Sequence, residues 1–282
     1  LFKKKSNIVG LIVPHISTYF FAELIESLED AITSAGYKLM IFNSKDDVEL
    51  EKKYINVLNQ YNIDGLILVA NTNSVIPYLN LKIPVITIDH IIDEKIPSIS
   101  SDNVQGGELA ARKLIECGAK KIIHFRGPSD LITVIDRSRG FYQVMDDANI
   151  DVYSFDLDFR KPDIEDIEMF IKKNPDVDGI FCSSDIIAFY VISALKRLGY
   201  SIPEDVQVIG FDNTQDAKNF SVPLTTIDTD KELLGKEGIV TLLNRIKYIE
   251  DTNRVIHIKT SSIFRATTKW KTYYPFIIIG IS

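Results

Sequence analysis

The sequence predicts an α/β fold of two doubly wound lobes, each a parallel sheet with helices on both faces. Short apolar runs rich in β-branched residues recur along the chain, and stretches with helical spacing of apolar residues separate them. The same rhythm restarts after Gly127-Pro128, which indicates two similar lobes. Apolar strands that alternate with amphipathic helices are typical of parallel sheets covered on both sides. A chain of 282 residues is long enough for one large or two modest domains.

The first half of the chain alternates predicted strands and helices. Residues 8–13 form an apolar run that we expect to be a buried strand. From Phe21 to Ala35, apolar residues recur on one helical face, and Gly36 supplies a stop. Further strands are predicted at 39–42, 66–69, 85–88 and 122–125, with helices at 48–61 and 104–117.

The second half repeats this alternation after Gly127-Pro128. The predicted helices lie near 136–148, 164–173 and 186–198, the strands at 180–182 and 206–210, and a last long helix at 230–249. No low-complexity segment interrupts the pattern.

The charge balance argues against direct binding of nucleic acid by this chain. Its formal net charge is −7, and an acidic surface repels phosphates. The one basic cluster, Lys3 to Lys5, is either a solvated terminus or the stub of a linker to a preceding segment. Because the first residue is Leu1 rather than Met, we expect a fragment or a processed product.

Cysteine usage and hydropathy indicate a cytoplasmic chain without membrane contact. Cys117 and Cys182 stand in apolar surroundings without metal-ligand spacing, which favours buried, reduced thiols over a disulfide. No signal-peptide pattern precedes the first strand. The final apolar run, 276–281, is too short to span a bilayer and is either an extra strand or a foreign tail.

Polar and aromatic residues follow the predicted strands, where open parallel sheets bind ligands. Tyr19 to Phe21 come after the first strand, and Asp89-His90 follow the strand at 85–88. Ser184-Asp185 and Asp212 end two strands of the second half. Ionised carboxylates accept hydrogen bonds from neighbouring hydroxyls, and aromatic faces cover the C–H faces of a sugar ring. A sugar or similar polyol therefore fits this pattern better than an anion.

Each of these residues also has a structural interpretation. Asp185 stands where a helix N-cap is expected, and Phe21 falls at a core-facing position, so Phe20 is the better ligand contact of the two aromatics. His90 by itself is typical of a polar loop. The shared placement at strand ends carries the binding hypothesis.

The sequence lacks the short motifs of common enzyme chemistry. No GxGxxG follows the first strand, and GxxxxGK[ST], GxSxG, HExxH and metal-spaced Cys/His clusters are absent. We therefore predict a binding protein that is not an enzyme and has no cofactor and no metal.

Five motifs together resemble the LacI/GalR family of transcription regulators, over about residues 7 to 268. The most specific are Pro203-Glu204-Asp205-Val206 through Gly210-Phe211-Asp212-Asn213, and Pro223-Leu224-Thr225-Thr226-Ile227. The others are Phe20-Phe21-Ala22-Glu23-Leu24, Asp64-Gly65-Leu66-Ile67-Leu68, and Ser101-Asp102-Asn103 with Gly106-Gly107 and Ala110-Ala111.

The resemblance implies a periplasmic-binding-protein-like fold of type I, with three crossovers near Gly127, Thr229 and Lys259. The N-terminal lobe is then expected to comprise 6–127 plus 230–258, and the C-terminal lobe 128–229 plus 259–282. The ligand is expected in the cleft between the lobes.

The resemblance also supplies ligand residues by motif position. With the strand-end residues they give the predicted ligand-binding set Phe20, Phe21, Asp89, His90, Arg137, Phe159, Ser184, Asp185 and Asp212. Arg137 has an alternative interpretation as a surface helix ion pair. Two positions depart from the family, because Ser184 stands where Asn is frequent and His90 where Arg is frequent. The ligand therefore cannot be copied from a relative.

The function implied is that of the effector-sensing domain of a transcription repressor. A small-molecule effector, expected to be a sugar, binds the cleft and controls how a homodimer binds operator DNA. The DNA is expected to contact an N-terminal helix-turn-helix that this sequence does not contain. The alternatives are a periplasmic or lipoprotein sugar-binding component of a transporter and an α/β enzyme acting on a sugar.

Overall fold

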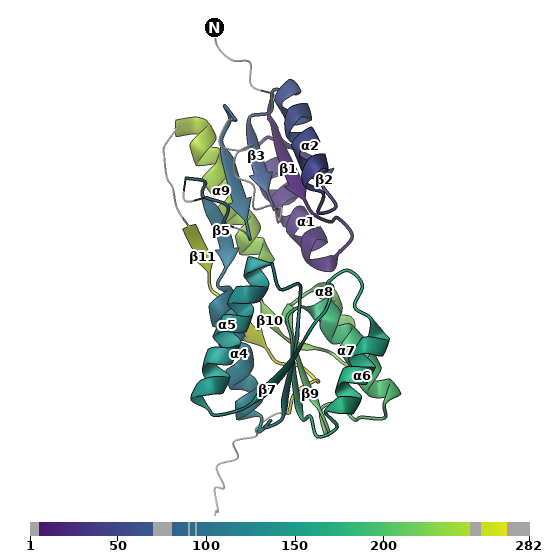
Figure 1. Cartoon of the computed structure of the whole chain (residues 1–282). Coiled ribbons are helices and arrows are strands. Elements are labelled where there is room, and N and C mark those ends of the chain that lie inside the picture. The colour runs from purple at the N-terminus through teal and green to yellow at the C-terminus, as the bar shows by residue number, and fades with distance from the viewer. Residues whose placement is uncertain (1–5, 70–80, 90, 94, 249–254, 270–282) are drawn as a thin grey trace, which may run out of the picture.

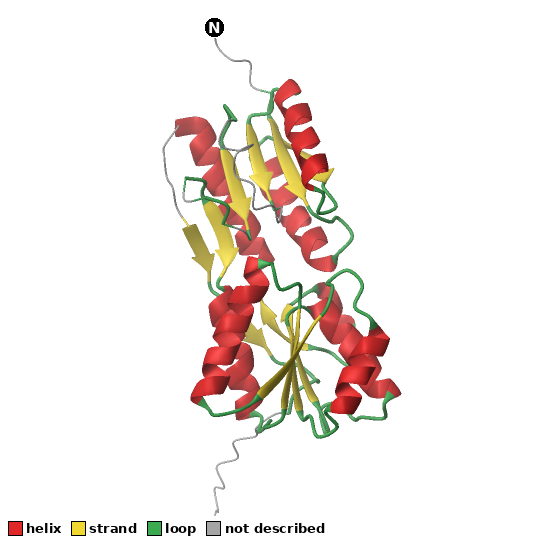
Figure 2. Ribbon diagram, in the orientation of Figure 1, coloured by secondary structure: helices red, strands yellow, loops and turns green. Residues whose placement is uncertain are grey.

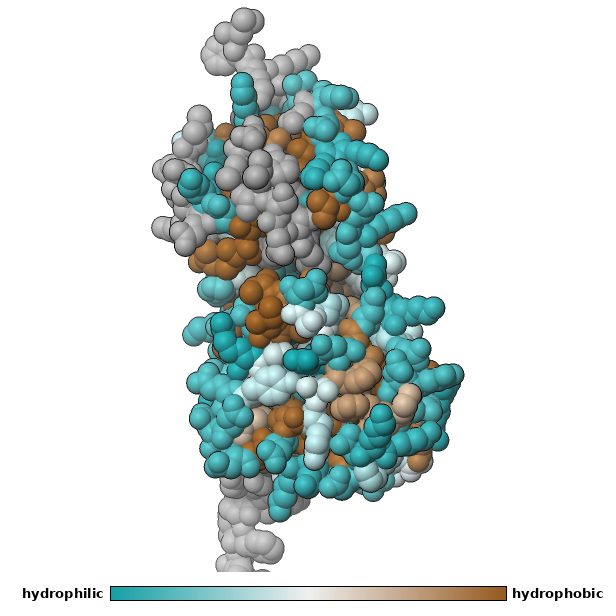
Figure 3. Space-filling model, viewed as in Figure 1, coloured by the Kyte–Doolittle hydropathy of each residue, from teal (hydrophilic) through white to brown (hydrophobic). Residues whose placement is uncertain are grey.

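The computed structural model describes residues 6–69, 81–89, 91–93, 95–248 and 255–269. The described chain forms two lobes, one above the other in Figure 1, each with a six-stranded sheet between layers of helices (Figure 2). The predicted fold class, two α/β lobes with parallel-dominated sheets, is confirmed. Hydrophilic side chains cover much of the second lobe on the face shown in Figure 3, with apolar patches between them.

The first sheet has the strand order β11-β5-β4-β3-β1-β2, and all of its pairs are parallel. Its strands are β1 (Ile8–Val13), β2 (Lys38–Asn43), β3 (Gly65–Leu68), β4 (Val85–Ile88), β5 (Ser98–Ser101) and β11 (Val255–Ile258). Helices α1 (Tyr19–Ser34) and α9 (Lys231–Tyr248) pack together on one face, and α2 (Val48–Gln60) covers the other.

The second sheet has the order β12-β10-β9-β8-β6-β7, and only the β10–β12 pair is antiparallel. Its strands are β6 (Ile122–Arg126), β7 (Val152–Asp156), β8 (Gly179–Cys182), β9 (Gln207–Asp212), β10 (Thr225–Asp228) and β12 (Ser261–Ile263). Helices α4 (Asn103–Glu116) and α5 (Ile132–Asp147) cover one face. Helices α6 (Ile164–Lys173) and α7 (Asp185–Arg197) cover the other, and the short α8 (Gln215–Asn219) follows β9.

The alternation of side chains along the strands explains why both faces need helices. In β1, Val9, Leu11 and Val13 are buried against α1 and α9, whereas Ile12 is buried on the α2 side. A strand with apolar residues on both faces exposes one of them to water unless a helix covers each side. The central strands of both lobes are mostly apolar on both faces, and the polar residues that line the cavity come from the strand ends and the loops and helices that follow them.

One predicted boundary is wrong. The predicted first lobe, 6–127, includes α4 and β6, but β6 pairs with β7 and β8 in the second sheet, and α4 packs against α5. The first crossover therefore lies between β5 and α4, next to Asp102, and not near Gly127. The other two crossings lie between β10 and α9 and between β11 and β12.

Most predicted elements are present within a few residues of their predicted bounds. The sequence analysis missed the strands β5, β7, β10, β11 and β12. Of these, β5 reads Ser-Ile-Ser-Ser, and β7 carries exposed Tyr153 and Ser154 between half-buried residues. Their backbone pairing, and not an apolar run, defines them. Cys117 and Cys182 are both free of disulfides, as predicted, although Cys117 is only partly buried. The predicted tail at 276–281 lies outside the described residues. In the described ranges no helix is long and apolar enough to cross a membrane.

Two glycines let α4 and α5 touch backbone to backbone. A Cβ added at Gly107 would lie 2.0 Å from the carbonyl oxygen of Arg137, and one at Gly140 would lie 1.9 Å from that of Val104. Any larger side chain must push the helices apart. The glycines therefore fix where Arg137, on α5, enters the space between the lobes.

We expect Gly107→Ala to lower the free energy of unfolding by about 1–3 kcal/mol, because over-packing against backbone cannot be relieved by a rotamer change. Urea denaturation measures this loss. Glu116→Ala is the matched control on the same helix, since the Glu116 side chain is 64% exposed, and it should change stability by less than about 0.5 kcal/mol. Equal stability of both variants would contradict the close helix contact.

Candidate functional site

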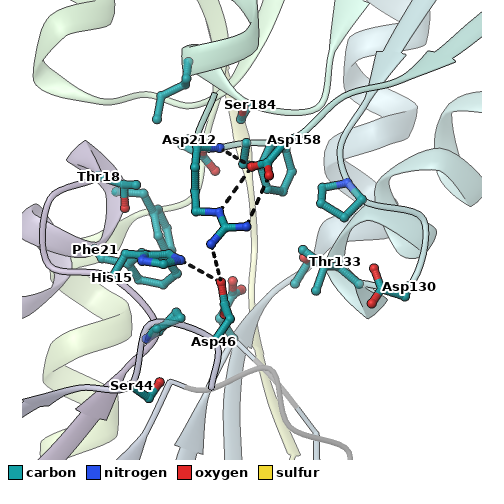
Figure 4. A pocket seen from close by; sticks show the side chains of 18 of the residues that line it. His15, Thr18, Phe21, Ser44, Asp46, Asp130, Thr133, Asp158, Ser184 and Asp212 are labelled. Carbon is teal, nitrogen blue, oxygen red and sulfur yellow. Dashed lines mark hydrogen bonds and ion pairs between the residues drawn. The ribbon is translucent and has the colours of Figure 1, made fainter. Parts of the chain in front are cut away.

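A cavity of about 370 Å³ lies between the lobes, lined from both (Figure 4). Its walls come from the residues that follow the strands: Pro14 and His15 follow β1, and Ser44 and Asp46 follow β2. Asp158 and Ser184 follow strands of the second sheet. The volume lies at the lower end of the range that small-molecule sites occupy, about 300–1,000 Å³.

The structure brings most of the predicted ligand residues to this cavity. The predicted residues that line it are Phe20, Phe21, Asp89, Arg137, Phe159, Ser184 and Asp212. Asp185 does not line it, and His90 lies outside the described residues.

Arg137 is held in one orientation by groups from three different segments. Its Nε donates to Oδ1 of Asn103 at 2.8 Å, and one Nη donates to the carbonyl oxygen of Ser183 at 2.6 Å. The other Nη lies 3.3 Å from Oδ1 of Asp212, and the guanidinium stacks 3.9 Å from the ring centroid of Phe211. With its side chain 5% exposed, Arg137 is no surface helix ion pair. A guanidinium has five N–H donors, so some remain for a ligand.

Asp89 presents a buried acceptor oxygen that has no hydrogen-bond partner within the described part of the chain. It follows β4 with φ of 63°, in the left-handed region, which turns its side chain off the strand. Among the described residues, nothing bonds its Oδ1. Burial raises the pKa of Asp89 to about 6, although the charge of Arg137 and a hydrogen bond from Asn103 both lower it. Buried acceptors are normally satisfied, so this oxygen indicates a ligand donor.

Asp212 is the second carboxylate of the cavity. Burial raises its pKa to about 6, and the charges of Arg137 and Lys231 lower it while that of Glu23 raises it. Asp89 and Asp212 share Arg137 as their counter-charge, and the charge of Asp212 raises the pKa of Asp89. Burial therefore brings the titration of both carboxyls into the range around pH 6.

Asp185 belongs to a buried network behind the cavity. Its carboxylate accepts hydrogen bonds from the backbone N–H of Thr214 at 2.7 Å, from the Thr214 hydroxyl at 3.0 Å and from the Thr226 hydroxyl at 2.6 Å. The helix N-cap is Ser184, whose Oγ accepts from the N–H of Ile187. The alternative prediction of an N-cap was therefore one residue off, and Asp185 ties β10 and the loop after β9 to α7.

Aromatic side chains face the cavity from both lobes. Phe20 and Phe21, on the first turn of α1, meet edge to face with ring centroids 5.2 Å apart, and both are partly buried against the first-lobe core. Phe159 comes from the loop after β7 and packs so closely on Gly127 that an added Cβ there would lie 2.1 Å from its ring. The cavity thus has apolar walls on opposite sides of its charged groups.

Four polar residues that the sequence interpretation did not single out form a chain across the cleft. His15 lies 2.6 Å from Asp46 through Nε2, and Arg160 approaches the same Asp46 oxygen at 3.8 Å from the other lobe. Arg160 also pairs with Asp158 at 3.2 Å (Figure 4). The sequence contains a signal that places these residues at the cavity: Asp158 and Arg160 flank the predicted ligand residue Phe159, and Asp46 follows a strand. Within the described ranges no group of three or more His, Cys, Asp or Glu is placed to hold a metal ion.

Known proteins are similar to this chain in sequence and in fold. Residues 6–267 match the family described as periplasmic binding proteins and sugar binding domain of LacI family. The chain is 35% identical over 275 residues to the ribose operon repressor of Halalkalibacterium halodurans, covering 95% of this chain and 82% of that protein. It is 31% identical to the HTH-type transcriptional repressor PurR of Aliivibrio fischeri, covering 92% of this chain and 80% of that one.

Solved structures agree. A periplasmic binding protein/LacI transcriptional regulator from Alkaliphilus metalliredigens, complexed with D-xylulofuranose, has a TM-score of 0.85 at 32% identity and covers 94% of this chain and 100% of its own. A LacI family transcriptional regulator from Enterococcus faecium with bound ribose has a TM-score of 0.82 at 25% identity, covering 93% and 98%.

The chain therefore belongs to the family of periplasmic binding proteins and LacI sugar-binding domains. Within that family its named relatives are transcription repressors, and it is the effector-sensing domain of a LacI-type repressor rather than a component of a transporter.

Two substitutions should separate a cavity carboxylate from a structural one. At pH 7.5 we expect Asp185→Ala to lower the free energy of unfolding by about 1–3 kcal/mol, because alanine leaves the buried N–H of Thr214 and the hydroxyls of Thr214 and Thr226 without their acceptor. Asp89→Asn should leave stability unchanged or raise it. The pKa of Asp89 is raised in the folded protein, so its ionised form costs stability above about pH 6. Thermal and urea unfolding measure both, and a greater loss for Asp89→Asn would refute the assignment.

Proposed function

We propose that this domain binds a neutral monosaccharide of pentose size, such as ribose, as the effector of the repressor. The observation that carries the proposal is the unpartnered, buried Oδ1 of Asp89 beside the fixed guanidinium of Arg137. Sugar hydroxyls supply both the donor that Asp89 lacks and acceptors for the remaining N–H groups of Arg137. Phe20 and Phe159 then cover the two apolar faces of the ring.

The charge of the cavity favours a neutral ligand over a phosphorylated one. Of the residues that the structure describes, two arginines line the cavity against six carboxylates, Asp46, Glu51, Asp89, Asp130, Asp158 and Asp212. A negative potential repels phosphate. Relatives named as ribose operon repressors and a regulator structure with bound ribose support the pentose assignment.

The ligand acts by favouring one arrangement of the lobes. A molecule that contacts Asp89 from the first lobe and Arg137 from the second stabilises the arrangement in which both reach it. In a homodimer this changes the spacing of the DNA-reading domains and so operator affinity. Tyr19, Ile41 and Val240 are exposed apolar side chains of the first lobe and candidate dimer contacts. The domain works in the cytoplasm and turns over no substrate.

We expect calorimetric titration to show ribose binding that depends on Arg137. Arg137→Ala should weaken the affinity about tenfold to a hundredfold, the loss expected for charge-assisted hydrogen bonds. Arg139→Ala is the matched control on the same helix, because the Arg139 side chain is 63% exposed and does not line the cavity. Ribose 5-phosphate and a purine base serve as comparison ligands. No binding of ribose, with tight binding of either comparison ligand, would overturn the proposal.

Ribose affinity should be highest above pH 7 and fall as the pH drops through 6. The pKa values of Asp89 and Asp212 are each raised to about 6, and protonation turns one carboxylate oxygen into a donor and removes the charge that strengthens the hydrogen bonds from sugar hydroxyls. If one ionised carboxylate is required, the loss approaches about tenfold per pH unit below the pKa.

The predicted fall in ribose affinity below pH 6 can be distinguished from acid unfolding, because protonation of Asp89 and Asp212 has the opposite effect on the stability of the folded protein. Because burial raises both pKa values, protonation of these two groups stabilises the folded ligand-free protein as the pH falls from 7 to 5. Asp89→Asn should flatten the pH profile of binding. A profile that stays flat in the unaltered protein between pH 5 and 8 would exclude these carboxylates as ligand acceptors.

A further inference from the structure

A buried lysine stands at the crossover between β10 and α9. Lys231 is the first residue of α9 and is only 8% exposed. Its Nζ donates to the carbonyl oxygens of Asp212 and Asn213, the residues at which the chain leaves β9. The same Nζ lies 3.3 Å from Oε2 of Glu23. Lys231 thus contacts the backbone of a cavity residue without lining the cavity itself.

Glu23 brings the first lobe into this contact. It lies on α1, which packs on α9, so its position is fixed by the first-lobe core. While Oε2 pairs with Lys231, Oε1 accepts the backbone N–H of Gln215 at 2.7 Å, at the start of α8 in the second lobe. Both oxygens of Glu23 are therefore engaged, one by the crossover and one by the second lobe.

The backbone at the end of β9 needs such support. Asp212 has φ of 107° and Asn213 has φ of 49°, values in which residues other than glycine are strained. In this conformation their carbonyl groups point out of the sheet ladder toward Lys231, and the Asp212 carbonyl also accepts a long hydrogen bond from the Thr229 hydroxyl. A strained backbone conformation persists only where surrounding groups stabilise it. Here the ammonium group of Lys231 does this by donating hydrogen bonds to the carbonyl oxygens of Asp212 and Asn213.

We propose that Lys231 and Glu23 are positioning residues for Asp212: they hold this carboxylate in the ligand cavity only while the two lobes are in contact. The proposal rests on the proposed function for the cavity itself. Opening the lobes separates Glu23 from Gln215 and loosens Lys231, so Asp212 loses its fixed place opposite Arg137. Ligand affinity then depends on the lobe arrangement through a contact that no ligand atom touches.

Lys231 and Glu23 shift the pKa of Asp212 in opposite directions. The charge of Lys231 lowers the pKa of Asp212, and that of Glu23 raises it. The charged groups that surround Asp212 from the packed elements are Arg137 of α5, Lys231 of α9, Glu23 of α1, Asp185 of α7, Asp89 after β4 and Arg265 after β12. Neutralising Lys231 or Glu23 leaves the rest of this set in place.

The test compares Lys231→Met and Glu23→Gln with the unaltered domain. Methionine keeps the length of the buried chain. Glutamine keeps one acceptor oxygen for the N–H of Gln215, and its amide nitrogen replaces the oxygen that pairs with Lys231. Carboxyl NMR of the ligand-free protein, with the Asp212 signal assigned by its loss in Asp212→Asn, measures the pKa directly. We expect the pKa of Asp212 to rise in Lys231→Met and to fall in Glu23→Gln. Shifts of the same sign, or none, would overturn the proposal.

Matched controls come from the same two helices. Lys236 on α9 and Glu26 on α1 are exposed, so Lys236→Met and Glu26→Gln change the net charge equally and should leave the Asp212 titration unchanged. If the controls shift it as much as the test variants, the effect is one of overall charge and the proposal fails. Should Lys231→Met not fold, Glu23→Gln alone still decides, because the Glu23 side chain is partly exposed.

Titration with ribose at pH 7.5 adds the functional readout. Lys231→Met should weaken ribose affinity at least tenfold, and Lys236→Met should not change it. A domain in which Lys231→Met binds ribose with unaltered affinity would contradict the positioning role. If the unaltered domain does not bind ribose, the proposed function fails. The NMR titration of the ligand-free protein still shows whether Lys231 sets the pKa of Asp212, because that measurement needs no ligand.

Discussion

The contacts of the Arg137 guanidinium hold together the elements from which the cavity is built. Asn103 at the first crossover, Ser183 after β8 and Asp212 after β9 all bond to this one side chain, which lies on Phe211. Its position depends on the helix contact at Gly107 and Gly140, because a wider spacing of α4 and α5 would withdraw it from the strand ends. A local choice of glycine thus determines where the guanidinium that faces both Asp89 and Asp212 can lie.

In the part of the chain that the structure describes, the cavity has fewer hydrogen-bond donors than its buried carboxylates can accept, and a ligand can supply the missing donor. Two carboxylates share one guanidinium, and burial raises the pKa of both to about 6. An unpaired buried acceptor such as Oδ1 of Asp89 costs about 1–3 kcal/mol in the ligand-free state. Hydroxyl groups can satisfy it without adding charge. In the proposed function, a neutral polyol satisfies this acceptor and so favours the arrangement of the lobes in which it is bound.

The sequence was sufficient to predict the fold class and the convergence of the cavity residues, because strand ends and family motifs are local features. It was insufficient where the structure depends on distant partners. The role of Asp185 follows from Thr214 and Thr226, 29 and 41 residues away. The cross-cleft contact of Asp46 with Arg160 joins the two lobes, and the position of each residue after a strand does not show that the two pair. The first crossover was misplaced because Gly127-Pro128 has the composition of a boundary, whereas the chain actually crosses at Asp102, beside the serine-rich β5.

The central claim is that Asp89 and Arg137 hold a sugar between the lobes. A crystal structure of the domain with ribose tests it most directly. The account predicts a ribose hydroxyl within hydrogen-bonding distance of Oδ1 of Asp89, a second one at the guanidinium of Arg137, and the ring between Phe20 and Phe159. A structure in which ribose lies elsewhere, or in which Oδ1 of Asp89 is bonded by a protein group and not by the sugar, would contradict it.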